Sequence, residues 1–111
     1  MSKALEELAE KVGRVSDIYA TRNDIARDDD WYALKLQEEV GELVSAYLRL
    51  TGRGRAKGEG REAIAASLAD EAADVLAQLL LFAAHNGIDL AAALDRKWFS
   101  YLDKSPTRSP A

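Results

Sequence analysis

The sequence contains no cysteine, a single histidine and only two prolines among its 111 residues. The lack of cysteine excludes disulfides and thiolate metal sites, and it makes a reducing cytoplasm the simplest setting. Few prolines and few β-branched residues, beside many alanines and leucines, favour helices over strands. The chain is 48% hydrophobic and 31% charged, which is typical of a globular domain and too apolar for disorder.

Excess positive charge and long apolar runs are also missing. The net charge is −4, and an acidic chain is a poor partner for a nucleic-acid polymer, because duplex binding rests on a positive surface. The N-terminal residues do not read as a signal peptide. The longest apolar stretch is interrupted by Asp74, Gln78 and His85, so we expect no membrane partner and a cytoplasmic protein.

Apolar residues recur at three- and four-residue spacing, which predicts four helices. These are expected at residues 3–20, 31–50, 62–85 and 90–102. Asp28 and its acidic neighbours are placed to cap the second helix, Gly52 to end it, and Asn86-Gly87 to end the third. We therefore predict one all-α domain over residues 1–104 and a disordered tail at 105–111. A chain this short leaves much surface exposed, which favours self-association.

Five carboxylates on the expected second and third helices stand out: Glu38, Glu39, Glu42, Glu71 and Asp74. Within each helix, members three residues apart share a face. Glu71 lies inside an apolar stripe, where a carboxylate is costly unless it is paired or binds a cation. One acidic pair of this kind usually lies on a solvated helix face. For two such pairs on adjacent apolar helices, a metal site and a solvated face are about equally favoured.

A site built from carboxylates alone selects magnesium, manganese or calcium, since zinc prefers His or Cys. The sequence has no EF-hand loop, whereas carboxylates that share magnesium with water and phosphate oxygens suit a phosphate-processing site. The GRGRAKG segment at residues 52–58 lacks the residue order of a P-loop. The acidic residues are therefore the candidate phosphate-processing centre.

The stretch Glu38-Glu39-Val40-Gly41-Glu42, followed by Glu71-Ala72-Ala73-Asp74, resembles the EExxE and ExxD signature of the MazG-type all-α nucleoside triphosphate pyrophosphatases. The resemblance covers residues 31–101. It implies a four-helix bundle that assembles into a homodimer or homotetramer. It also implies cleavage of a (deoxy)nucleoside triphosphate between its α and β phosphates, which yields a monophosphate and pyrophosphate. Phosphoribosyl-ATP pyrophosphatase and dUTPase-like relatives remain alternatives for the substrate.

The resemblance also implies roles for individual residues. The expected Mg²⁺ ligands, which Mn²⁺ can also occupy, are Glu39, Glu42, Glu71 and Asp74. Glu38 is expected to hold a further ion or to orient the attacking water. The related pattern KxxxNxxR is matched at Lys97, but Tyr101 stands for its asparagine and Lys104 for its arginine. We therefore expect Lys97, and more weakly Lys104, to contact the phosphates.

Two residues early in the second helix complete the candidate site. Trp31 is expected either to stack on a nucleobase or to pack against another helix, with about equal weight. Lys35 lies one turn before Glu39, is the only basic residue in that part of the helix, and is expected to contact substrate. A hypothesis of a different class is a non-catalytic helical assembly module, whose acidic residues pair with a partner and which needs no metal.

Overall fold

The described part of the chain folds into four α-helices and a short 3₁₀ segment. The computed structural model describes residues 3–103, and this part of the chain contains no strand. The elements are α1 (Lys3–Arg22), α2 (Asp29–Leu50), α3 (Arg61–His85), α4 (Leu90–Lys97) and the 3₁₀ helix η1 (Phe99–Asp103). The prediction of an all-α chain with four helices is confirmed. Lys104 and the expected tail at 105–111 lie outside the described residues.

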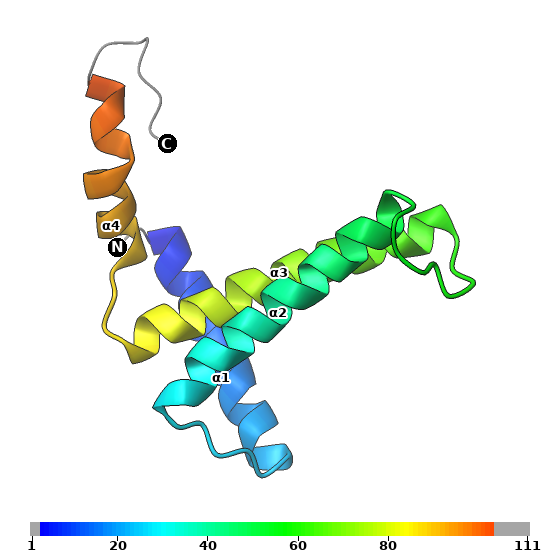
Figure 1. Cartoon of the computed structure of the whole chain (residues 1–111). Helices are drawn as coiled ribbons and strands as arrows, with labels where there is room; N and C mark the ends of the chain where they lie inside the picture. Colours follow the sequence, from blue (N-terminus) through cyan, green and yellow to red (C-terminus); the bar gives the residue numbers. More distant parts are fainter. Residues whose placement is uncertain (1–2, 104–111) are drawn as a thin grey trace.

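The centre of the structure is the antiparallel hairpin of α2 and α3, which pack against each other along their length (Figure 1). Ala46 of α2 has no exposed surface, and Ile64 near the start of α3 is also buried. Leu36 and Leu43 lie on the same side of α2 as Ala46 and are partly buried. The small side chain of Ala46 allows close approach of the two helices, and the larger apolar residues stabilise the contact.

The ends of the hairpin helices follow from a few residues. Asp28 caps α2, and its Oδ1 accepts a hydrogen bond of 2.8 Å from the backbone N–H of Trp31. At the other end of α2, Gly52 has a φ of +78°, and Gly87 beyond α3 has a φ of +66°. Glycine adopts this left-handed conformation without a steric penalty. The predicted start signal of α2 and the predicted stop signals of both helices are confirmed.

The fourth helix differs from its prediction. Asp89 caps α4 by accepting a hydrogen bond of 3.1 Å from the N–H of Ala92, but the α-helix ends at Lys97 and the chain continues as η1. This segment projects away from the hairpin (Figure 1). Its apolar residues Leu94 and Leu102 stay 43% and 81% exposed. A short helix takes most of its stability from packing, so one with an exposed apolar face has little to extend it.

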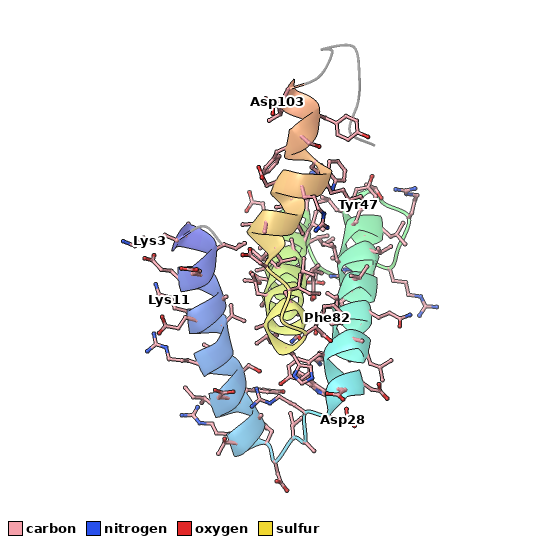
Figure 2. All side chains as sticks on the ribbon, turned by 90° about the vertical axis from the view of Figure 1, so that its left-hand side faces the viewer. Lys3, Lys11, Asp28, Tyr47, Phe82 and Asp103 are labelled. Atoms are coloured by element: carbon pink, nitrogen blue, oxygen red, sulfur yellow. The ribbon has the colours of Figure 1, made fainter. Side chains whose placement is uncertain are left out.

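Helix α1 packs across α3, which lies between α1 and α2 (Figure 2). The connector from α1 to α2 is tied back by Arg27, whose guanidinium donates hydrogen bonds of 2.8 Å to Ser16 Oγ and to Asp17 Oδ1. The backbone N–H of Ile25 bonds to the carbonyl of Ala20 at 2.9 Å. These contacts fix the angle between the end of α1 and the start of α2.

The hydrophobic core is thin. Its buried members are Ala20, Ala46, Ile64, Leu80, Leu81 and Ala83, and among the described residues no large side chain is fully buried. The Cα radius of gyration is 17.1 Å, against about 13 Å for a compact domain of this length. No single described helix is long and apolar enough to cross a membrane, and α3 passes that test only jointly with the α4–η1 segment, at a bend of 97°.

The Asp28 cap should make a measurable contribution to stability. Asp28→Ala removes the acceptor for the Trp31 N–H and should lower the free energy of unfolding by about 1 kcal/mol. Urea unfolding at fixed protein concentration, followed by far-UV circular dichroism, measures the change. Glu59→Ala, which removes a carboxylate from the exposed 51–60 loop, should leave the midpoint unchanged. Equal midpoints for Asp28→Ala and the wild type would contradict the role of this cap.

Candidate metal centre

Three carboxylates from the two hairpin helices meet at one point. One carboxylate oxygen from each of Glu39, Glu71 and Asp74 lies within 4.8 Å of the other two. Glu39 comes from α2 and the others from successive turns of α3. The side chain of Glu39 is only 13% exposed, whereas Asp74 is open to solvent. The antiparallel packing thus gathers three like charges at a half-buried point with one open side.

The burial and the crowded negative charges of this arrangement act on the carboxyl of Glu71. Burial raises the pKa of its carboxyl, and the charges of Asp74, Glu39 and Glu42 raise it further, while Arg49 acts weakly in the opposite direction. A cation nearby would favour the charged form of this carboxyl and so offset the effects that raise its pKa. The electrostatics therefore favour a positive ion between α2 and α3.

Lys35 supplies part of the positive charge, but only at the edge of the cluster. Its Nζ lies 3.3 Å from Glu38 Oε1 and 3.7 Å from Glu39 Oε1. Partial burial lowers the pKa of Lys35, but its hydrogen bond to Glu38 and the charges of Glu38 and Glu39 outweigh this, so the pKa is raised. The lysine leaves Glu71 and Asp74 without an ion-pair partner at salt-bridge distance within residues 3–103.

The donor set fits magnesium or manganese. All three members offer carboxylate oxygens, and the chain's one histidine, His85, is engaged elsewhere: its Nε2 lies 2.8 Å from Asp29 Oδ1. Hard cations of this kind bind through one or a few carboxylates and take their remaining ligands from water and phosphate oxygens. The exposed side at Asp74 leaves room for such ligands. Glu39, Glu71 and Asp74 would hold the ion.

The other residues predicted for the site lie at different distances from this group of three carboxylates. Glu42 is close enough to raise the pKa of Glu71 but is exposed and lies outside the group of three. Glu38 is exposed and joined to the cluster only through Lys35. Lys97 is exposed on α4, in the segment that projects from the hairpin, and does not line the pocket beside the cluster. Lys104 lies outside the described residues.

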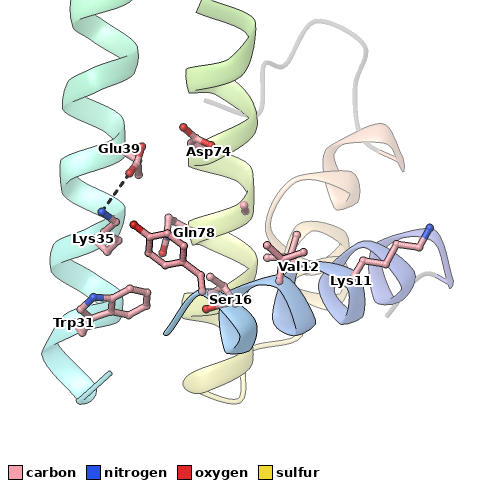
Figure 3. A pocket seen from close by; sticks show the side chains of 12 residues that line it. Lys11, Val12, Ser16, Trp31, Lys35, Glu39, Asp74 and Gln78 are labelled. Carbon is pink, nitrogen blue, oxygen red and sulfur yellow. Dashed lines mark ion pairs between the residues drawn. The ribbon is translucent and has the colours of Figure 1, made fainter. Parts of the chain in front are cut away.

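A pocket of about 580 Å³ adjoins the cluster, between α1 and the hairpin (Figure 3). Twelve residues from three helices line it: Lys11, Val12, Val15, Ser16, Tyr19, Trp31, Lys35, Glu39, Asp74, Ala77, Gln78 and Leu81. Sequence reasoning placed Trp31 and Lys35 at the site but missed α1 and Gln78. The one available signal was that Gln78 interrupts an otherwise apolar stretch of α3.

The grouped carboxylates on this all-α hairpin, beside an open pocket, are the kind of donors that a divalent cation shares with phosphate oxygens. Comparison with protein-family models matches residues 27–111 to the MazG nucleotide pyrophosphohydrolase domain, and the chain belongs to that family. The match begins after α1 and covers the whole of α2 and α3. Comparisons with curated proteins and with solved structures found no match.

Glu71 gives a direct test of the metal centre. Glu71→Gln keeps the shape of the side chain but removes a charge that Asp74, Glu39 and Glu42 oppose, so it should raise the melting temperature of the metal-free protein. With magnesium at about 100 times its Kd, the wild type should gain about 2.7 kcal/mol, and the variant should lose most of this gain. Differential scanning fluorimetry with and without magnesium measures both effects.

The matched control is Asp70→Asn, which neutralises the exposed carboxylate next to Glu71 in the chain. It should respond to magnesium as the wild type does. A Glu71→Gln variant that is less stable without metal, and equally stabilised by magnesium, would remove Glu71 from the metal centre.

Proposed function

We propose that this chain is a magnesium-dependent pyrophosphohydrolase that cleaves a (deoxy)nucleoside triphosphate between its α and β phosphates. One observation carries the proposal: in a member of the MazG nucleotide pyrophosphohydrolase family, carboxylates from α2 and α3 converge to within 4.8 Å. The pocket beside them is large enough for part of a nucleotide. Phosphoribosyl-ATP, which carries the same type of bond, is the alternative substrate.

Each group of the site then has a task. Magnesium held by Glu39, Glu71 and Asp74 would neutralise phosphate charge and acidify a water molecule. Glu38 would orient the attacking water and accept its proton as the water oxygen bonds to the α phosphorus. The bond from that phosphorus to the bridging oxygen breaks, and pyrophosphate leaves. Lys35, which lies within 3.3 Å of Glu38 and 3.7 Å of Glu39, holds both carboxylates in place.

Product analysis tests the reaction. Purified protein is incubated with magnesium or manganese and a panel of canonical nucleoside triphosphates, their deoxy forms and phosphoribosyl-ATP. We expect a monophosphate and pyrophosphate from at least one of them, and Glu39→Gln should abolish this turnover while the far-UV signal persists. Glu62→Gln, an exposed change in the first turn of α3, is the control. Absence of turnover with every substrate would favour the non-catalytic assembly module.

We propose further that the active form is a homo-oligomer. Val40, Val44 and Tyr47 recur at four- and three-residue spacing on α2 and are 41%, 50% and 48% exposed. A second stripe on α4 and η1 contains Leu94, Trp98 and Leu102. Two exposed apolar stripes beside so thin a core favour burial against further copies of the chain, as a homodimer or a homotetramer.

A charge within the α2 stripe should break this assembly. Val44→Glu should shift the protein toward the mass of a single chain in size-exclusion chromatography with light scattering, because a buried, unpaired carboxylate is strongly unfavourable at an interface. Ser45→Glu is the matched control, since the next residue lies about 100° further round the helix. A wild-type protein that is monomeric at all concentrations would contradict the proposal.

A further inference from the structure

The chain's one histidine lies where the end of α3 meets the start of α2. His85 is the last residue of α3, and Asp29 is the first residue of α2. His85 Nε2 lies 2.8 Å from Asp29 Oδ1, a distance at which an imidazole N–H donates a hydrogen bond to a carboxylate. The two residues are 56 positions apart in the sequence, so this bond ties together two helix ends that no connector joins.

The imidazole of His85 also stacks on an aromatic ring. Its centroid lies 4.1 Å from that of Tyr32, and the planes of the two rings differ by only 15°. Asp29 and Tyr32 are three residues apart, so both face the end of α3 from the first turn of α2. The side chain of Asp29 is 95% exposed, and an ion pair so open to solvent adds little stability. Its effect is on orientation, because the bond to Asp29 fixes the plane of the imidazole against Tyr32.

Tyr32 passes this restraint to the pocket through its neighbour in the chain. The ring centroids of Trp31 and Tyr32 are 5.0 Å apart and the rings are perpendicular, which is a favoured edge-to-face arrangement. Consecutive residues of a helix point about 100° apart, so Tyr32 meets His85 while Trp31 lines the pocket (Figure 3). Lys35 and Glu39 follow Trp31 on the same side of α2 and line the same pocket. The Trp31 ring therefore belongs to the wall that leads to the carboxylates.

We propose that His85 is a positioning residue of this pocket: by holding Tyr32, it holds the ring of Trp31 in the place where that ring forms part of the wall. His85 does not itself line the pocket and is not one of the three grouped carboxylates. A tryptophan side chain that is not held has several rotamers open to it, and a ligand that needs one of them then binds more weakly. The consequence for substrate rests on the proposed function, whereas the restraint on Trp31 does not.

The fluorescence of Trp31 tests the restraint without any ligand. The chain has two tryptophans, so Trp98→Phe, which keeps an aromatic ring at that position, leaves Trp31 as the one reporter. In this background, His85→Ala should increase acrylamide quenching of Trp31 and lower its fluorescence anisotropy, because Tyr32 loses the ring that holds it. His85→Phe keeps a flat ring against Tyr32 and should restore most of the restraint. Unchanged quenching in His85→Ala would overturn the proposal.

Two further variants in the same background separate this restraint from a general loosening of the helix end. Asn86→Ala removes a different contact at that end, the 2.8 Å bond from the side-chain amide to the carbonyl of Phe82. It should leave the quenching of Trp31 unchanged, and an effect equal to that of His85→Ala would contradict the proposal. Tyr32→Leu should free Trp31 as His85→Ala does, and combining the two should add little, since both break one chain of contacts. Additive effects would contradict the link through Tyr32.

Steady-state kinetics with the preferred triphosphate of the substrate panel test the consequence for substrate. His85→Ala should raise KM by about three- to tenfold, the equivalent of one aromatic contact, with kcat largely kept. An unchanged KM would contradict this consequence, and a fall in kcat at that KM would place His85 in the chemistry instead. A restrained Trp31 in a protein that hydrolyses no triphosphate would support the positioning role and count against the proposed reaction alone.

Discussion

The packing of α2 against α3 is the contact on which the rest of the site depends. The apolar residues that make this contact, Ala46 and Ile64 among them, are on the same helices as Glu39 and Glu71. Burying those apolar residues therefore brings the carboxylates together whether or not they repel. Like-charge pairs on a helix surface cost a few tenths of a kcal/mol each, and partial burial raises that cost. The hydrophobic contact outweighs this cost, so the packing of the two helices itself assembles the cluster.

Much of this geometry could be predicted from local sequence, because it depends on periodicity. Glu71 and Asp74 share a face of α3, and Glu39 lies on the same face of α2 as the apolar residue Leu36. An antiparallel hairpin of the two helices then brings the three carboxylates together. Glu42 was predicted with them, but it is exposed and lies outside the group of three, because the spacing does not set how α2 is rotated toward α3. The angle of α1, the pocket it closes and the passage of α4 into a 3₁₀ helix were not predictable, because they depend on contacts between distant residues.

If a triphosphate binds here as proposed, the charge balance favours a cation at the carboxylates. A triphosphate that approaches Glu39, Glu71 and Asp74 meets a negative field, and Lys35 is already engaged by Glu38 and Glu39. The predicted phosphate contact Lys97 is on α4, which projects from the hairpin. Among the residues that line the pocket, Lys11 is the one further cation, so phosphate gains little from the positive charges described at this site. If copies of the chain assemble as proposed, a neighbour is the natural source of further positive charge.

The two ends of the site place different demands on the chain. The carboxylates need only the hairpin, whose whole length falls within the family match at residues 27–111. The pocket also needs α1, which precedes that match and is oriented by Arg27. A change in α1 can therefore alter the shape around Trp31 and Gln78 without moving Glu39 or Asp74. On this arrangement, the hairpin sets the positions of the three carboxylates, and the helix laid across it sets the shape of the pocket beside them.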